Sequence, residues 1–466
     1  MKLNKFVLKI SSLFAAIDAI GWLILLLLGP IFLLIKPSQS WVLLIIPATW
    51  IISALARKNP IPYTPFNLAL LIILIQVLVS LYATYDIAVS LQKITGVLWG
   101  ISVFYALLRL NLTKKGILLS TLVFIAAGAG IAVLGLLGIE WPSNKFILFN
   151  SIYEQFPQLS DFIPGIQEGF HPNEVGGALT WIVPSLLVIS LWLLFRLKKI
   201  HQHLSIFILI PLLILNLFLF SLSTLVLVFS QSRSAYLGMA VSIVLLLLFT
   251  LPKKLKFAYL SLLLIGSSVL VYFILQGELI VYINRLFPDN GAASMAFSMN
   301  TMSGRVEIWS RAIYAIQDFA FTGMGMNTFR TIVNVLYPLQ TIAADVPVKD
   351  IGHAHNLFLQ VALDLGIPGL IGFLAVYILS FWMILKSMVR LKAFRSGNSS
   401  KNPLIINEFY YVLMVGLLGG QLAHLGYSMT DAIALGAKPG IIFWIMQSII
   451  CGIFLQVDKK RRRIVQ

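Results

Sequence analysis

Long apolar runs, separated by short polar or basic segments, dominate the chain from end to end. Many of these runs reach the roughly 20 residues that an α-helix needs to cross a bilayer. The pattern therefore predicts an all-α polytopic membrane protein with a single transmembrane domain over residues 1–466. We expect about twelve transmembrane helices, at residues 11–35, 41–56, 67–83, 87–108, 116–138, 173–195, 205–229, 235–251, 257–276, 356–385, 409–428 and 434–456.

The composition excludes a soluble protein. Of the 466 residues, 59% are hydrophobic and only 11% are charged. A net charge of +17 could point to nucleic acid, but the basic residues lie in short clusters between the apolar runs, so we expect no nucleic-acid partner. The single cysteine, Cys451, lies in the last apolar run and offers neither a disulfide nor a thiolate metal site. The first apolar run continues to Ile35, which is too long for a cleavable signal and predicts a retained first helix.

The placement of the basic clusters predicts the orientation in the membrane. With both termini on the cytoplasmic side, every inner segment is basic, and the outer segments carry most of the acidic residues. The inner basic clusters are residues 2–9, 57–58, 109–115, 196–199, 253–256, 386–401 and 459–463.

Two of the predicted outer segments are long, residues 139–172 and residues 277–355. Connections of about 80 residues are rare, and they are usually functional or disordered. From Ser303 the larger loop predicts an amphipathic helix, followed by a TGMGMN turn. We expect its apolar face to hold Val306, Trp309, Ile313 and Ile316.

The stretch GHAHNLFLQVALDLGIPGLIG at residues 352–372 joins this loop to the next apolar run. His353 and His355 lie where the loop meets the predicted helix, and Asn356 is suited to cap it. Asn356 forms a polar stripe with Gln360 and Asp364 at helical spacing, and such a stripe should face the bundle interior or a wet cavity. Three residues just below are expected to break or kink the helix: Gly366, Pro368 and Gly369.

Further polar residues belong to the same predicted outer side. Arg233 lies in SQSRSAYLG and Arg305 in SGR; a lone arginine could instead snorkel to the headgroups or pair with a surface acid. His171 and Asn173 open the sixth predicted helix in GFHPNEVGG, where ordinary capping is an equally good interpretation. Two more groups, His424 and Asp431, close the eleventh predicted helix.

Together these residues predict an outward-facing membrane site with arginines and histidines. Arginine binds phosphate in a bidentate manner, and histidine takes up a proton near neutral pH. A lipid-linked diphosphate with a polar group outside the bilayer fits this chemistry. The sequence has no HExxH motif and no acidic pair at metal-ligand spacing, so we expect neither a metal ion nor another cofactor.

The stretch GHAHNLFLQVALDLGIPG resembles the signature of the O-antigen ligase superfamily, which is His, then Asn, Ser or Gln, then nine residues, then Gly-x-x-Gly. His355, Asn356, Gly366 and Gly369 fit this signature without a gap. SQSRSAYLG is similar to the family's outer Ser-Arg segment, and SGRVEIWSRAIYAIQDFAFTGMGMNTF to its loop segment. The resemblance implies a fold similar to the C-type membrane glycosyltransferases in the bacterial plasma membrane.

The resemblance also implies an inverting, metal-independent transfer of a glycan from a polyprenyl-diphosphate carrier to a glycan, lipid or protein acceptor. His355 is the expected catalytic residue, and the expected substrate-binding residues are Arg233, Arg305, His353, Asn356, Asp364, His171 and Asn173. A polysaccharide polymerase and a bacterial oligosaccharyltransferase are alternatives within the superfamily. A solute transporter of the inorganic-carbon type is an alternative of another class, but a transporter should carry ionisable groups near the midplane. Asp18, an acid inside the first predicted helix, is the exception that this alternative could use.

Overall fold

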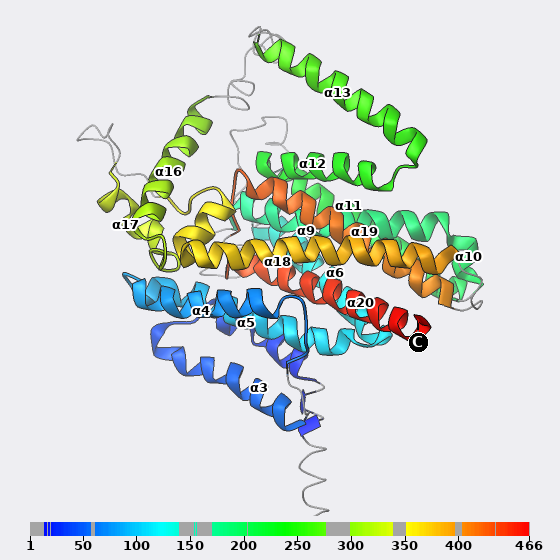
Figure 1. The fold of residues 1–466 in the computed structure, drawn as a ribbon, viewed down its shortest axis with the longest axis horizontal. Coiled ribbons are helices and arrows are strands. Elements are labelled where there is room, and N and C mark those ends of the chain that lie inside the picture. The colour runs from blue at the N-terminus through cyan, green and yellow to red at the C-terminus, as the bar shows by residue number, and fades with distance from the viewer. Residues whose placement is uncertain are drawn as a thin grey trace, which may run out of the picture.

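The computed structural model of the protein describes residues 14–15, 17–18, 20–56, 61–138, 153, 155, 170–202, 204–275, 299–338, 351–396, 403–433 and 435–465. These parts of the chain are mainly helical and form an elongated bundle (Figure 1). The helices labelled there are α3 (Ile45–Ala56), α4 (Asn67–Ala83), α5 (Ile87–Asn111), α6 (Lys114–Gly138), α9 (Pro172–Phe195), α10 (Leu197–His201), α11 (Ile206–Phe229), α12 (Arg233–Thr250), α13 (Lys253–Leu275), α16 (Met299–Asp318), α17 (Thr328–Leu336), α18 (Leu357–Ser396), α19 (Pro403–Ser428) and α20 (Ile441–Val465).

The described residues confirm the all-α prediction and are consistent with a polytopic membrane protein. Within the described residues, 8 helical segments are long and apolar enough to cross a membrane, and the apolar helices at Asn67–Ala83 and Arg233–Leu248 are shorter. Because the first expected span lies partly outside the described residues, the count of twelve stays a prediction. Most helix ends agree with the expected ranges to within a few residues. The last helix begins at Ile441, later than expected, because a short 3₁₀ turn at Lys438–Gly440 precedes it.

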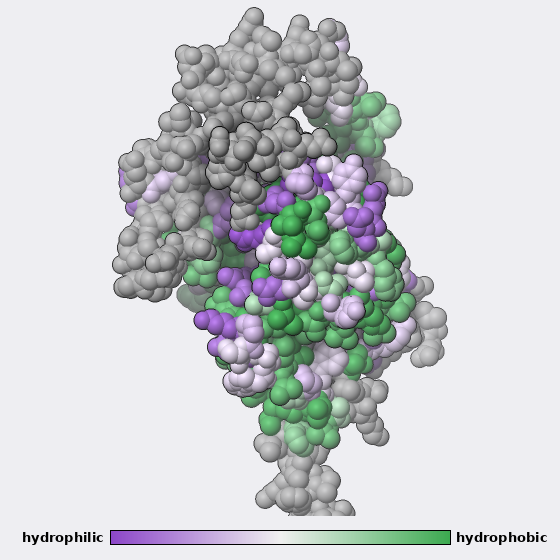
Figure 2. All heavy atoms as spheres, turned by 90° about the vertical axis from the view of Figure 1, so that its left-hand side faces the viewer, coloured by the Kyte–Doolittle hydropathy of each residue, from purple (hydrophilic) through white to green (hydrophobic). Residues whose placement is uncertain are grey.

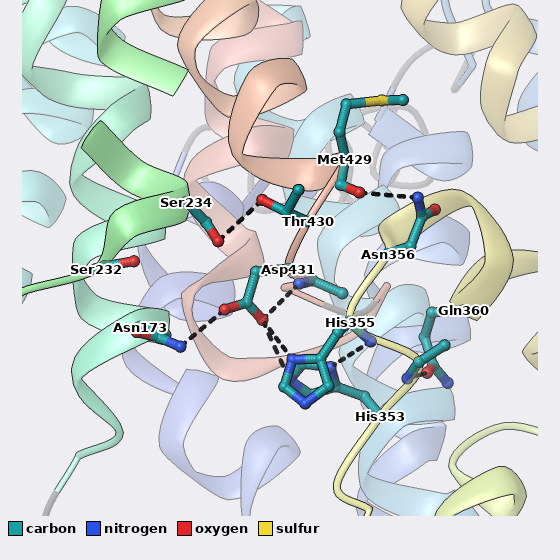
Figure 3. Close-up of polar contacts among 12 residues, drawn as sticks. Asn173, Ser232, Ser234, His353, His355, Asn356, Gln360, Met429, Thr430 and Asp431 are labelled. Atoms are coloured by element: carbon teal, nitrogen blue, oxygen red, sulfur yellow. Dashed lines mark hydrogen bonds and ion pairs between the residues drawn. The ribbon is translucent and has the colours of Figure 1, made fainter. Parts of the chain in front are cut away.

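Helix packing in the bundle brings distant parts of the sequence together. α19 packs against both α9 and α12, α18 against α4, and α20 against α5. Close approach depends on small residues, as is common between membrane helices. At Gly420 of α19, a Cβ atom would lie 2.3 Å from the carbonyl oxygen of Trp181 in α9. The starts of α9, α12 and α18 and the segment after α19 consequently meet at one end of the bundle (Figure 3).

The expected break in the helix after the histidines is confirmed at Gly366, whose backbone is non-helical with φ of 68° and ψ of 177°. At the break the helical hydrogen bond between the Leu363 carbonyl and the Ile367 N–H is missing, and both groups bond instead to the predicted outer loop. The Leu363 carbonyl accepts the N–H of Met324, and the N–H of Ile367 donates to the Ala320 carbonyl, each at 2.7 Å. Gly366 thus docks the TGMGMN turn onto α18.

Replacing Gly366 with alanine should therefore destabilise the protein. The left-handed φ is strained for any side chain, and the new Cβ would lie 2.3 Å from the Phe321 carbonyl oxygen. We expect a loss of about 1–3 kcal/mol, visible as a lower thermal unfolding temperature in detergent. Gly130→Ala in α6 is the matched control, because a Cβ atom added there would have no neighbouring atom within 4 Å. Equal unfolding temperatures for the two variants would contradict this account.

The described part of the predicted outer loop, residues 299–338 and 351–355, has a small hydrophobic core of its own. α16 and α17 pack with the turn and α18 through Ala312, Ala315, Met324, Phe329, Val333, Ile351, Ala354 and Leu363. The amphipathic helix is confirmed, and Ile316 packs against this core as expected, but the expected apolar face is wrong at two positions. Val306 and Ile313 are exposed, whereas Ala312 and Ala315 are buried. The small alanines allow α16 to lie close to its neighbours, which hydrophobicity alone does not predict.

Two other sequence observations have structural explanations. Asp18 is buried, accepts a hydrogen bond of 2.5 Å from the Ser53 hydroxyl and lies 3.8 Å from the Arg109 guanidinium. These contacts give the Asp18 carboxylate a hydrogen-bond donor and a positive partner inside the bundle. In the 139–172 segment, Tyr153 is buried, and its hydroxyl donates to the Phe229 carbonyl at 2.9 Å. This residue therefore anchors the turn before Arg233.

Candidate active site

His353 and His355 face the carboxylate of Asp431 (Figure 3). The start of α18, which follows them, lies at the end of the bundle that carries α17 (Figure 1). His353 Nε2 lies 3.6 Å and His355 Nδ1 lies 3.4 Å from Asp431 Oδ1. The two imidazole rings are 4.4 Å apart. Asp431 is 1% exposed, whereas the side chains of His353 and His355 remain 19% and 29% exposed. The two histidines are thus the accessible part of a cluster whose single carboxylate is buried.

The start of α18 holds His355 in place. The Asn356 side chain accepts the N–H groups of Phe358 and Leu359 at 3.0 and 3.1 Å, which confirms the expected cap. Its amide also donates to the Met429 carbonyl at 3.1 Å, which ties the helix start to the Asp431 segment. His355 itself has a left-handed backbone with φ of 46°. Such strain in a non-glycine residue persists only where the surroundings impose it, and it is common at functional sites.

Asp431 is fixed independently of the histidines. Asn173 at the start of α9 donates to its Oδ2 at 2.9 Å, and the N–H of Ala432 donates to its Oδ1 at 2.9 Å. The Asn173 side chain therefore binds Asp431, and α9 begins without a side-chain cap. Thr430 donates to Ser234 at 3.0 Å and joins this segment to α12. Three elements that are distant in sequence, the start of α9, the start of α18 and the segment after α19, thus converge on one carboxylate, and α12 is joined to them through Thr430.

The charges of the cluster depend on burial. Burial lowers the pKa of His353 to about 3, although the neighbouring Asp431 carboxylate opposes this shift. Burial also raises the pKa of Asp431, but the contact with His355 and the other nearby groups hold it below its ordinary value. Near neutral pH the arrangement is therefore an ionised carboxylate beside a neutral His353. Lys93 and His171 lie within electrostatic range of His353.

His353, His355 and Asp431 also have the composition of a metal site. One potential ligand atom from each lies within 4.8 Å of the others, the one such group among the residues described. However, His353 Nδ1 accepts the backbone N–H of His355 at 3.1 Å. A neutral imidazole with an acceptor at Nδ1 carries its proton on Nε2, the nitrogen that faces Asp431. A protonated nitrogen is no metal ligand, so the cluster fits a hydrogen-bonded arrangement better than a metal site.

The two candidate arginines belong to neighbouring elements. Arg233 is the first residue of α12, after a turn in which Gln231 has a left-handed φ of 50°. Arg305 lies in α16 and is close enough to Arg233 for their like charges to repel. Arg305 is also within electrostatic range of Tyr427, which lies near Asp431. Both side chains are half-buried, so this end of the bundle carries two partly desolvated positive charges.

The remaining predicted residues have different surroundings. Asp364 is fully buried and accepts hydrogen bonds from the Asn327 N–H at 3.0 Å and the Gln360 amide at 2.9 Å. Gln360 also accepts the N–H of Ala354 between the histidines, at 2.9 Å. The expected polar stripe is therefore an internal support for the loop. His171 precedes α9 and is exposed.

The sequence placed Asp431 on the same predicted outer side but gave it no role in the site, and it did not single out Lys93. Asp431 lies beyond the motif, and its role depends on where α19 ends. Lys93 lies in α5, half-buried, where its backbone packs against Gly436. A charged residue inside an apolar span is a signal of function, and that signal could have identified Lys93. Hydrophilic residues gather at this end of the molecule, next to a largely hydrophobic flank (Figure 2).

Part of the candidate site lies in a region that matches a known protein family. No curated protein matches the chain. Residues 217–374 match the family model described as O-antigen ligase. The matched region includes Arg233, Arg305 and both histidines, whereas Asn173 and Asp431 lie outside it. The match confirms the resemblance seen in the sequence over this region and supports an O-antigen ligase or polymerase type of membrane enzyme from the O-antigen ligase superfamily.

Proposed function

We propose that the protein transfers a glycan from a polyprenyl-diphosphate carrier to an acceptor hydroxyl at the outer face of the bacterial plasma membrane. The observation that carries this proposal is the position of His355. It lies at a capped helix start, partly exposed, with its imidazole 3.4 Å from the buried Asp431 carboxylate. The two arginines belong to the same end of the bundle, opposite the end that carries α10 and the C-terminus (Figure 1).

The proposed reaction has one displacement step. His355 removes the proton of the acceptor hydroxyl while the acceptor oxygen attacks the anomeric carbon of the glycan. The bond from that carbon to the diphosphate oxygen breaks, and polyprenyl diphosphate leaves from the opposite face. The anomeric configuration is therefore inverted. The Asp431 carboxylate stabilises the imidazolium that forms on His355, and Asn173 and the Ala432 N–H hold that carboxylate in position.

Arg233 and Arg305 are proposed to bind the diphosphate. A planar guanidinium binds phosphate oxygens in a bidentate manner and stays charged. The repulsion between the two arginines would be relieved by an anion bound between them. Asp364, Gln360 and Asn356 support the loop and the helix start rather than contacting the substrate. His353 orients the cluster, and His171 and Lys93 lie at its periphery.

The proposed orientation places the histidines outside and the basic segments inside. It follows the distribution of lysine and arginine between the apolar runs. α10, which carries Lys198 and Lys199, lies at the end of the bundle away from α17 (Figure 1). The polar site and the basic segments are consistent with opposite membrane faces.

The direct test is to incubate the purified protein with a polyprenyl-diphosphate glycan and candidate acceptors. Ligase activity would yield a glycosylated acceptor and free polyprenyl diphosphate, with the anomeric configuration inverted. Lengthening of the glycan on the carrier without a separate acceptor would instead indicate a polymerase. If the donor stays intact with glycan, lipid and protein acceptors, the proposed function is wrong.

Glycan transfer should survive exhaustive chelation. The His353 nitrogen that faces Asp431 carries a proton, and the arginines supply the positive charge that the departing diphosphate needs. We expect an unchanged rate after treatment with EDTA and dialysis into metal-free buffer. A matched sample with added Mg²⁺ should show the same rate. Loss of transfer that a single divalent ion restores would contradict the metal-independent mechanism.

A further inference from the structure

A cavity of about 440 Å³ lies between α9, α18 and α19, at the end of the bundle opposite the histidines. Its size falls within the range of about 300–1,000 Å³ that is typical of small-molecule sites. Aromatic and aliphatic side chains form much of its wall, among them Val188, Trp192, Tyr411 and Val412. None of the residues proposed above to take part in glycan transfer lines this cavity.

The charged residues of this cavity leave a positive balance. Arg196 and Lys392 line it together with one acidic residue, Glu408. The Glu408 carboxylate is only 8% exposed and lies 2.6 Å from the ammonium of Lys199, which neutralises it. Lys392 lies 5.4 Å from the centre of the Tyr411 ring, which holds its ammonium at the cavity wall. The cavity is therefore suited to an anion.

The rim of the cavity is apolar and exposed. Leu191 and Phe195 also line it, and they are 41% and 77% exposed at the surface of the bundle. In a membrane these side chains face lipid rather than water. The ligand that matches this surface has an anionic oxygen-rich part and a hydrocarbon part.

We propose that this cavity binds the headgroup of an anionic phospholipid from the cytoplasmic leaflet. Arg196 and Lys392 bind the phosphate, and an acyl chain follows Leu191 and Phe195. The assignment to the cytoplasmic leaflet rests on the proposed orientation of the bundle. That leaflet is rich in anionic lipids, which basic pockets between membrane helices bind.

The test measures lipid binding to the purified full-length protein in a neutral detergent, without any transfer assay. Phosphatidylglycerol, phosphatidylcholine with the same chains, and inorganic phosphate are titrated, and dissociation constants are obtained by native mass spectrometry. We expect phosphatidylglycerol to bind at least about tenfold more tightly than phosphatidylcholine, because charge-assisted hydrogen bonds are the stronger ones. Equal affinity for the two lipids would overturn the proposal, and so would phosphate binding as tightly as phosphatidylglycerol, which would indicate a soluble anion.

Variants locate the site. Arg196→Gln with Lys392→Gln should weaken phosphatidylglycerol binding by about tenfold or more. Lys114→Gln with Lys115→Gln is the matched control, since it removes the same charge from exposed positions at the start of α6 and should leave affinity unchanged. Equal losses in both double variants would mean diffuse attraction and would contradict a defined site. The single variants Arg196→Gln and Lys392→Gln should each weaken binding several-fold, and they decide the question if the double variant does not fold.

Discussion

His355→Ala should lower the rate of glycan transfer by about 10²–10⁴-fold, the usual contribution of a positioned acid–base group. His355 is partly exposed, and its ring makes no hydrogen bond that the helix cap needs, since Asn356 provides that cap. The thermal unfolding temperature and the affinity for the lipid carrier should therefore stay nearly unchanged. Turnover of the donor and the unfolding temperature of the same preparation provide the two measurements.

Two neighbouring substitutions separate a catalytic His355 from a structural one. His353→Ala should lower the transfer rate less than His355→Ala does. His353 accepts a backbone N–H and supports the cluster, but it does not take the proton of the acceptor hydroxyl. Asp431→Asn should also reduce transfer strongly, by up to about 10⁴-fold, since a neutral amide no longer stabilises the imidazolium that forms on His355. If His355→Ala lost stability together with activity, or if His353→Ala were the more damaging change, the assignment of the base would be wrong.

Arg233→Lys and Arg305→Lys should each lower transfer strongly, by about 10²-fold or more, as expected when one group that stabilises developing charge is removed. Lysine keeps the positive charge but lacks the planar fork that binds two phosphate oxygens at once. Arg233 and Arg305 lie within electrostatic range of each other, so a diphosphate bound between them would relieve the repulsion of their like charges. Single-turnover transfer and donor binding should be measured for each variant.

Arg330→Lys is the matched control for these variants. Arg330 lies in α17, is exposed and belongs to the same end of the bundle. Its replacement tests whether a change from arginine to lysine at any position near the predicted outer loop lowers the rate of glycan transfer. We expect transfer at the unaltered rate for this variant. Full activity in both Arg233→Lys and Arg305→Lys, at normal protein levels, would exclude the proposed binding of the diphosphate.

The internal contacts of the site were only partly predictable from the sequence. Asn356 was expected to cap a helix and does so, because a cap depends on residues within one turn. Gly366 was expected to break that helix, and its left-handed φ is again a local property. The stripe of Gln360 and Asp364 was expected at a site, yet both side chains hold the outer loop. A polar residue in an apolar helix signals a buried partner, but the sequence does not say which one.

The sequence by itself determined the apolar helices, their approximate ends and the motif at 352–372, because hydrophobic length, capping and glycine conformation depend on neighbouring residues. Only the tertiary structure decided that Asp431 faces the two histidines and that Asn173 binds this carboxylate. These contacts join residues more than fifty positions apart, and they depend on how α9, α18 and α19 pack. Packing is set by the shapes of whole helix surfaces, such as the close contact at Gly420, and no local pattern in the chain records it.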